Sequence, residues 1–399
     1  MNRLIFVFIL FFFPGVLLPH LSSAQTELPQ EEIWRGITSG GWPKSLGPLQ
    51  KRFRDGRSYV ALYEKLPIWP IDMRSPDRFK RSMGSREFFG QHSIGHMAIG
   101  WSCHGGRDVD SVGFTAQTGE DSSQQKQMLD EGWGVTAMIS TFTDGRMHTG
   151  PQIDEYFEQV YRDAVSENRQ PEPFFALVVE VPTSDCESVR DFSKAYVSHP
   201  SKPYKNFGMI PDPLKFEGAG CGSFAISALA KAPSLAPIMG QFWRTMPIPE
   251  KTLGRRTGVY LPNSVIPAAR AKTQKDERLI GLKRLLLMNW DAGKTAIDLR
   301  FVDPELSIFG LKKIMALAGP LFIPKSLNRV FNFPGRSGEA ATGGIEDNDY
   351  GYQEIDAQFD KNFGRVSLAI DTWWNQRASQ SLATPVEISH GHGVFIEFR

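Results

Sequence analysis

The residues with the clearest chemical potential lie in the stretch GAGCGSFAISAL, where Cys221 stands between glycines and directly before an apolar run with helical spacing. Free backbone N–H groups at a helix start stabilise a thiolate. Gly218, Gly220 and Gly222 let the backbone turn sharply, and they let a substrate carbonyl approach the N–H groups of an oxyanion hole. The stretch predicts a nucleophilic Cys221, with Gly222 in the oxyanion and substrate-binding region. A buried, inert thiol is the alternative.

A cysteine nucleophile needs a base to take its proton, and His96 has the residue type and position for this role. The stretch SIGHMAIGW places His96 at the beginning of an apolar strand. Because side chains alternate along a strand, His96 shares a face with the small Ala98 and Gly100, which would leave an open cleft on that side. We therefore predict that His96 accepts the Cys221 proton. A satisfied core histidine is the alternative.

An imidazole base also needs a partner that orients its ring. The strand of His96 and the next apolar segment form a predicted hairpin whose turn centres near Gly106. Antiparallel pairing about that centre places His96 roughly opposite Gln117, which can accept a hydrogen bond from an imidazole N–H. Gln117 is therefore the predicted third catalytic residue, and Thr115 on the same face is the alternative.

Hydrophobic periodicity predicts the elements that hold these residues. Apolar positions with i, i+3, i+4 spacing predict helices, and short alternating or continuous apolar runs predict strands. The expected helices cover residues 151–169, 184–196, 221–229, 277–290 and 303–319, and the expected strands cover 58–64, 96–103, 111–118, 134–142, 174–181, 295–302 and 393–398. Ser184 and Glu187 have the spacing of a capping box at the start of their helix.

The N-terminal residues indicate export. After a short basic start, an apolar run extends from Leu4 to Leu18, and Ser22 and Ala24 are the small residues of a cleavage site. The run is shorter than the roughly 20 apolar residues that span a bilayer, so an uncleaved anchor is the weaker alternative. Residues 1–24 are thus a predicted signal peptide, and the mature protein is expected to be periplasmic or extracellular, without a stable membrane span.

Length and charge limit the organisation and the partners. A chain of 399 residues suits two domains, or one domain with a large appendage. We expect an irregular N-terminal segment at 25–90, a domain carrying the chemistry at 91–245, and a C-terminal accessory region at 246–399. The 45 Lys and Arg residues nearly balance the 44 Asp and Glu residues, so no global charge favours nucleic acid as a partner. The sequence leaves the oligomeric state open.

The odd number of cysteines matters in an exported protein, because at least one thiol must stay unpaired within the chain. The three cysteines are Cys103, Cys186 and Cys221. If Cys103 and Cys186 form a disulfide, Cys221 is left as the free thiol that an exported cysteine enzyme needs. Both could instead be inert thiols, since the sequence does not show that they approach each other.

Five stretches together resemble the circularly permuted branch of the NlpC-type papain-like cysteine hydrolases and acyltransferases. These are GHMAIGW, the strand FFALVVEV, the helix SDCESVRDFSKAY, SKPYKNF and GCGSFAISAL. In that branch the histidine strand precedes the cysteine helix, as it does here over roughly residues 91–235. By this resemblance Cys221 matches the nucleophile and His96 the base, and Tyr204 resembles a tyrosine that lies before the cysteine in related proteins.

The resemblance implies both a fold and a reaction. The implied fold is α+β, with a papain-like core of antiparallel strands, a nucleophile helix and a C-terminal α/β extension. The implied reaction is that of an envelope amidase, peptidase or acyltransferase that works through a thioester intermediate, without a metal or other cofactor. The expected substrate is a cell-envelope component, either a peptidoglycan peptide or a lipid acyl group. A non-catalytic secreted protein that binds an envelope partner with a papain-like shell is the alternative.

Two other motifs give only weak indications of a metal site and of a dinucleotide site. His390 and His392 share a face if the stretch SHGHG is extended, where they could ligate a metal with His148 or His104. No spacing supports a specific metal site, so we expect surface histidines. The stretch GAGCGS departs from the dinucleotide-binding fingerprint, because Ser223 occupies the third glycine position and no strand precedes it.

Overall fold

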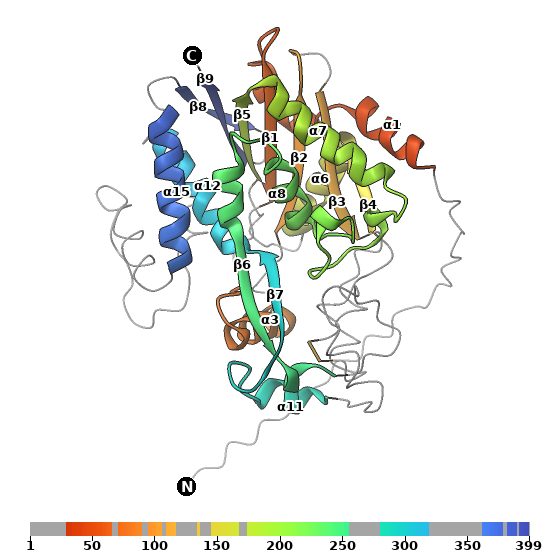
Figure 1. The fold of residues 1–399 in the computed structure, drawn as a ribbon, viewed down its shortest axis with the longest axis vertical. Helices are drawn as coiled ribbons and strands as arrows, with labels where there is room; N and C mark the ends of the chain where they lie inside the picture. The colour runs from red at the N-terminus through yellow and green to blue at the C-terminus, as the bar shows by residue number, and fades with distance from the viewer. Residues whose placement is uncertain are drawn as a thin grey trace.

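A seven-stranded sheet forms the centre of the molecule, with the order β4-β3-β2-β1-β5-β9-β8 (Figure 1). The computed structural model describes residues 29–65, 71–89, 95–105, 109–116, 134–135, 145–166, 174–254, 280–318, 361–377, 381–388 and 391–398. Neighbouring strands are antiparallel, except for the parallel pair β5 and β9. The strands are β1 (Ser58–Lys65), β2 (His96–Ser102), β3 (Val109–Ala116), β4 (Gly145–Thr149), β5 (Phe174–Val181), β8 (Ser381–Ile388) and β9 (Gly391–Phe398).

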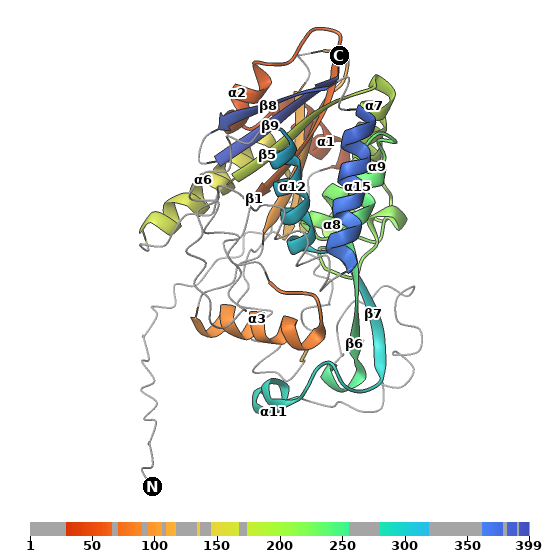
Figure 2. The same cartoon turned by 90° about the vertical axis from the view of Figure 1, so that its left-hand side faces the viewer.

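Helices cover both faces of this sheet. Figure 2 shows α2 and α6 on one side of the sheet and α7, α8, α9 and α15 on the other. The helices of the larger layer are α1 (Gln30–Gly40), α7 (Thr183–Ser198), α8 (Cys221–Leu229), α9 (Ala236–Met239), α12 (Pro304–Ala318) and α15 (Lys361–Arg377). The smaller layer consists of α2 (Gly47–Gln50) and α6 (Gly150–Ser166). The sheet is therefore buried on both faces, and each face has its own apolar core.

Side-chain alternation along β1 and β2 separates these two cores. Val60 and Leu62 belong to the core under α8, whereas Tyr59, Ala61 and Tyr63 belong to the core under α6. Directly paired residues on neighbouring strands project to the same face of a sheet.

The register of β1 and β2 extends this alternation to the polar residues. It pairs Glu64 with Met97 and Lys65 with His96. Met97 is part of the core under α8. Glu64 and Met97 therefore face α8, while Lys65 and His96 face α6.

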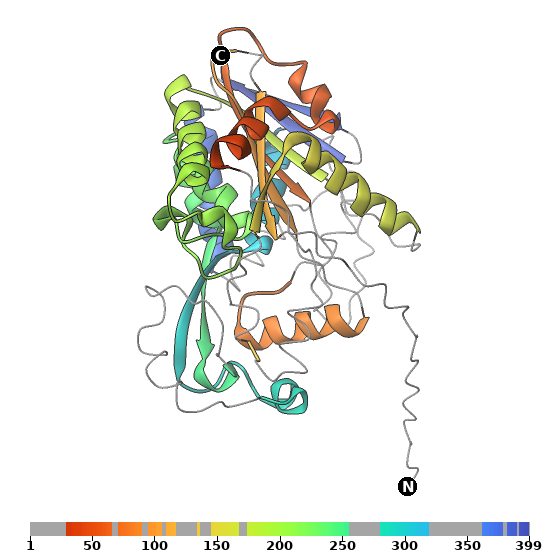
Figure 3. The same cartoon turned by 90° about the vertical axis from the view of Figure 1, so that its right-hand side faces the viewer.

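A second, smaller unit extends from the main body. The strands β6 (Trp243–Pro249) and β7 (Thr295–Val302) form a long two-stranded ribbon that leads to α3 (Pro76–Phe89) and α11 (Leu282–Leu287), as Figures 1 and 3 show. This unit has an apolar core of its own, which includes Phe79, Met246 and Trp290. Short 3-10 helices at Lys44–Leu46, Pro203–Lys205, Pro213–Lys215, Gly240–Phe242 and Glu250–Thr252 complete the described structure.

The coarse prediction of an α+β protein with a mostly antiparallel sheet is confirmed. The sheet also extends beyond the 91–245 range in which we expected it. Its central strand β1 comes from the supposedly irregular segment 25–90, and β8 and β9 come from the C-terminal region. Among the described residues, no helix is long and apolar enough to cross a membrane.

Several local predictions differ from the structure. The helix expected at 277–290 covers only Leu282–Leu287. The helix with the Ser184 and Glu187 pair begins one residue earlier, at Thr183, so no side chain caps it and Glu187 instead binds His104 at 3.0 Å. The strand β4 at Gly145–Thr149 was not predicted. Most of the strand expected at 134–142 lies outside the described residues.

One disulfide joins the end of β2 to α7. Cys103 and Cys186 are bonded, with 5.7 Å between their Cα atoms. Cys186 lies in the first turn of α7 and is fully buried. Cys221 is the free cysteine of the chain, as the cysteine count allowed.

Replacing Cys103 and Cys186 together by alanine is expected to lower the free energy of unfolding by about 2–5 kcal/mol, because the unfolded chain gains conformational freedom. Denaturant unfolding of the two proteins measures this difference. In the unreduced, unfolded wild-type protein, Cys221 should be the sole titratable thiol. Reactivity of Cys103 or Cys186 under those conditions would contradict the disulfide.

Candidate functional site

A cavity of about 190 Å³ lies where the main sheet meets the second unit, and Cys221 is in its wall. Domain boundaries are common places for small-molecule sites. Most of the lining is apolar, and it includes three methionines, three phenylalanines and four glycines. The lining consists of Glu64, Ile71, Met73, Phe79, Gly95, Met97, Phe207, Gly208, Met209, Gly220, Cys221, Gly222, Ser223, Phe301, Val302 and Pro304. The cavity therefore suits a ligand with an apolar part next to the thiol.

The sequence around Cys221 forms a helix start, as predicted. Cys221 is the first residue of α8, and Gly220 is the N-cap residue. The Gly220 N–H donates to the Ser223 hydroxyl at 2.8 Å, which fixes the first turn. Gly218 has a φ of +134°, and a Cβ atom there would lie 2.2 Å from the Asn206 carbonyl oxygen. Only glycine fits this turn without displacing backbone.

The thiol itself lies in a largely desolvated place. The Cys221 Sγ is 4.0 Å from the Gly95 carbonyl oxygen. Burial raises the pKa of the thiol above its ordinary value, while the backbone N–H groups of Met97 and Gly222 lower it. A negative charge on Glu64 raises this pKa further, and the positive charge of Lys65 lowers it. The helix start thus supplies N–H groups to the sulfur, but it does not produce a thiol that is ionised at neutral pH.

Glu64 is an ionisable residue of the cavity wall that the sequence analysis did not single out. Its side chain is 1% exposed, and it lines the cavity from β1. The Ser307 hydroxyl is 2.9 Å from Glu64 Oε1, whereas Oε2 is buried without a hydrogen-bond partner. Burial raises the Glu64 pKa from its ordinary value of 4.5 to about 8, against the lowering effect of the Ser307 hydrogen bond.

A carboxyl group with this behaviour links stability to pH. Its folded pKa is raised, so its stabilising contribution is complete below pH 4.5 and is lost as the pH rises through about 8. The signal in the sequence was an acidic residue on the same strand face as Val60 and Leu62 in SYVALYEK.

His96 does not lie beside Cys221. Its ring faces α6, with centroid distances of 4.9 Å to Tyr156 and 6.3 Å to Phe157. Burial, with smaller effects from the charges of His148 and Lys65, lowers the His96 pKa to about 3. The expected pairing of Cys221 with His96 is therefore absent, because His96 and its neighbour Met97 project to opposite faces of the sheet and Met97 takes the face of α8.

The other predicted site residues differ in where they lie. Gln117 lies outside the described residues. The β2–β3 register pairs Ala98 with Gly113, so its continuation would place Thr115 rather than Gln117 opposite His96. Tyr204 is buried in the main core and does not line the cavity, whereas Gly222 does line it.

The histidines considered as metal ligands do not converge either. His104 binds Glu187 at 3.0 Å on the surface, and His148 lies near Tyr156 with a centroid distance of 6.5 Å. His390 and the side chain of His392 lie outside what the structure describes. Within the described part of the chain, no group of three or more His, Cys, Asp and Glu residues is placed to hold a metal ion.

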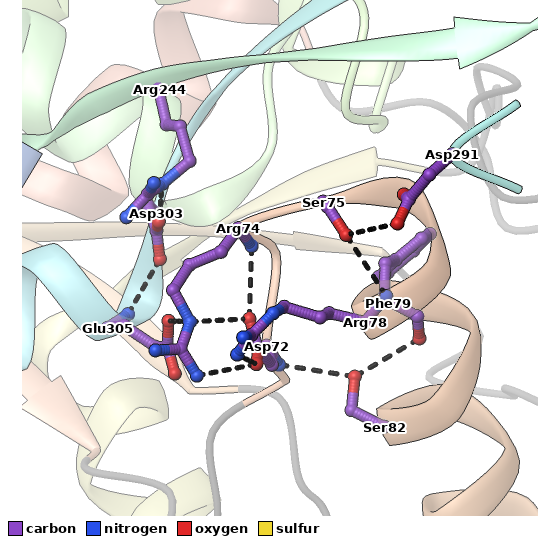
Figure 4. Close-up of polar contacts among 10 residues, drawn as sticks. All are labelled: Asp72, Arg74, Ser75, Arg78, Phe79, Ser82, Arg244, Asp291, Asp303 and Glu305. Atoms are coloured by element: carbon purple, nitrogen blue, oxygen red, sulfur yellow. Dashed lines mark hydrogen bonds and ion pairs between the residues drawn. The ribbon is translucent and has the colours of Figure 1, made fainter. Parts of the chain in front are cut away.

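An ionic network joins the two units behind the cavity wall (Figure 4). The Arg74 guanidinium donates to both carboxylate oxygens of Asp72, at 2.9 and 2.6 Å, and its Nε lies 3.4 Å from Glu305. Arg244 on β6 donates to the buried Asp303, which accepts the Glu305 backbone N–H at 2.8 Å. The network thus connects the segment before α3 with the start of α12.

This network positions two walls of the cavity. Ile71 and Met73 line the cavity and flank Asp72 in the sequence, while Pro304 lines it between Asp303 and Glu305. Because both partners of the ionic contacts are next to lining residues, the network holds the two walls at a fixed separation. The spacing of this cavity therefore depends on polar contacts that lie outside it.

No protein-family model, curated protein or solved structure matches this chain. The functional interpretation therefore rests on the residues and their geometry.

Replacing His96 by glutamine is expected to leave the reactivity of Cys221 unchanged. The two side chains face opposite sides of the sheet, so removal of the imidazole changes neither the charge nor the hydrogen bonds at the sulfur. Iodoacetamide labelling of Cys221 across about pH 5 to 10, followed by mass spectrometry, measures the apparent thiol pKa. A clear upward shift of that pKa in His96→Gln would show that His96 does act on Cys221, as the sequence predicted.

Proposed function

We propose that the protein is a cysteine hydrolase or acyltransferase, in which Cys221 attacks an amide or ester carbonyl of a substrate whose apolar part occupies the cavity. One observation carries this proposal: the free thiol at the first residue of α8 opens into an apolar cavity between two units. A thiol at a helix start, next to an apolar cavity, supplies the nucleophile and the binding space that thioester chemistry requires.

The local geometry supports both binding and attack. The backbone N–H groups at the start of α8 are donors for a carbonyl oxygen that becomes negative when the sulfur attacks. Met73, Met97 and Met209 contribute flexible thioether side chains to the lining, which can adjust to apolar groups of different shape. The substrate therefore combines an apolar group with an adjacent amide or ester.

Two further parts of the proposal rest on the sequence. The signal-like N-terminus favours an exported protein, so the substrate is a periplasmic or extracellular component of the cell envelope. A permuted NlpC-type papain-like fold agrees with two features of the chain. The strand β2, which carries His96, precedes the cysteine helix α8 in the sequence, and α8 packs on the sheet next to β2. The face on which His96 lies departs from the dyad that this resemblance implies.

A second candidate is a secreted protein that binds an apolar envelope ligand in the same cavity without chemistry. Two observations favour it: burial raises the pKa of the Cys221 thiol, and His96 lies on the other face of the sheet. Both candidates place a ligand in the same cavity, so they differ in whether a covalent bond to Cys221 forms.

A panel of aryl esters and anilides with acyl groups of increasing length tests the proposal on the mature, unreduced protein. We expect turnover and an acyl adduct on Cys221 in the wild-type protein, and loss of both in Cys221→Ser. Ser227→Ala is the matched control, because Ser227 lies on the same helix with a buried, unpartnered hydroxyl outside the cavity. Thermal melts confirm that both variants fold.

The outcomes separate the two candidates. Turnover that persists in Cys221→Ser would exclude Cys221 as the nucleophile. Binding of the acyl probes with neither adduct nor turnover in the wild-type protein would favour the non-catalytic function.

A further inference from the structure

The cavity holds a second ionisable group that the predicted mechanism did not include. Among the described residues that line it, Glu64 is the one titratable side chain besides Cys221. The environment of this carboxyl group indicates a role in the cavity rather than in the core.

The hydrogen bonds of Glu64 leave one oxygen available. The Ser307 hydroxyl lies within hydrogen-bond distance of Glu64 Oε1, at 2.9 Å, and of the Pro304 carbonyl oxygen, at 3.0 Å. A hydroxyl has one hydrogen, so it can donate to only one of these acceptors at a time. When Oε1 carries a proton, Glu64 donates to Ser307 and Ser307 donates to Pro304, which satisfies all three groups.

This arrangement accommodates both states of the carboxyl group. After ionisation, the Ser307 hydroxyl can turn to donate to Oε1. In both states Glu64 Oε2 remains a buried acceptor without a donor. Such an atom is costly to bury unless a ligand or a neighbouring donor supplies the hydrogen bond.

The other ionisable group that lines the same cavity is the Cys221 thiol. Glu64 pairs with Met97 in the register of β1 and β2, and the Met97 N–H faces the Cys221 sulfur. The sulfur and the carboxyl group are therefore close to the same position of β2. Their electrostatic coupling agrees with this placement, because a charge on Glu64 raises the thiol pKa.

We propose that Glu64 accepts the Cys221 proton, in the role that the sequence assigned to His96, and returns it to the leaving group. This inference rests on the proposed function. The proton moves from Sγ to the Glu64 carboxylate, directly or through one water molecule. The thiolate then forms a bond to the carbonyl carbon, and the electron pair of the C=O bond moves to the oxygen.

Collapse of this intermediate breaks the bond from carbon to the amine or alcohol, which takes the proton from Glu64. The Glu64 carboxylate then takes a proton from water, or from an acceptor alcohol or amine. The resulting nucleophile attacks the thioester and releases the Cys221 thiolate, to which Glu64 returns the proton. Atoms and charges balance with no further reactant.

The acid–base properties of the two groups fit this exchange. The Glu64 pKa of about 8 is much closer to the raised pKa of the thiol than an ordinary carboxyl pKa is. Proton transfer is most efficient when donor and acceptor are closely matched near the working pH. Lys65 is the other charged group that acts on the sulfur, and it acts from the opposite face of the sheet.

The variant Glu64→Gln distinguishes two roles of Glu64, that of a proton acceptor and that of a nearby negative charge. If Glu64 is the proton acceptor, thiol labelling and turnover should change in opposite directions. Removing the negative charge lowers the Cys221 pKa, so iodoacetamide labelling near pH 8 should become faster. Turnover of the acyl probe should nevertheless fall by about 100-fold or more, since the proton acceptor is lost. In the wild-type protein the turnover rate should rise with pH near pH 8, where Glu64 ionises, and this rise should disappear in Glu64→Gln.

Two other variants complete the test. Ser307→Ala removes the hydrogen bond that lowers the Glu64 pKa, so the same rise should shift to higher pH while turnover persists above it. Glu180→Gln replaces a buried acid on β5 that neither lines the cavity nor belongs to the ionic network, and should leave the labelling of Cys221 unchanged.

The outcomes keep this inference distinct from the proposed function. Unchanged or faster turnover in Glu64→Gln, together with loss of turnover in Cys221→Ser, would overturn the role of Glu64 and leave the cysteine hydrolase or acyltransferase in place. Turnover that persists in Cys221→Ser would overturn the proposed function itself.

Discussion

The alternation of side chains along β1 and β2 is the constraint on which the site depends. Successive residues of a strand project to opposite faces, so a single step along β2 separates Met97, under α8, from His96, under α6. The register then brings Glu64 to the same face as Met97. A carboxyl group, and not an imidazole, thus shares the cavity with Cys221.

The second constraint is the boundary between the two units. The cavity needs lining residues from the main sheet, from α8 and from the ribbon of β6 and β7. Arg74 and Asp72 on one side, and Glu305 on the other, link these parts through buried and half-buried ionic contacts. Buried charges are costly to separate from their partners, so this network favours one relative arrangement of the walls. The shape of the cavity therefore depends on contacts between segments that are distant in the sequence.

Much of the local structure could be predicted from the sequence. The helix start at Cys221, the helix from about residue 151 and the strands β1, β2, β5 and β7 follow from apolar periodicity and glycine placement. The cysteine count made the Cys103–Cys186 disulfide one consistent solution. The helices and strands follow from local residue spacing, and the disulfide follows from the number of cysteines, so a single sequence is enough to predict them.

The partner of the thiol could not be predicted in the same way. Its identity depends on which face of the sheet α8 covers, and periodicity in β2 does not distinguish the two faces because both are buried. Glu64 is 157 residues from Cys221 in the sequence, and only the pairing of β1 with β2 brings them to one cavity. The ionic network that spaces the walls depends on equally distant segments.

The proposed proton transfer requires that the buried Glu64 carboxyl group and the Cys221 thiol titrate as a coupled pair. Carbon-13 NMR of the protein labelled at glutamate side-chain carboxyl carbons measures this coupling directly, with Glu64→Gln to assign the signal. We expect the Glu64 signal to titrate near pH 8, and we expect its titration to change when Cys221 is replaced by serine. Titration of Glu64 near its ordinary value of 4.5, unaffected by Cys221→Ser, would exclude this transfer.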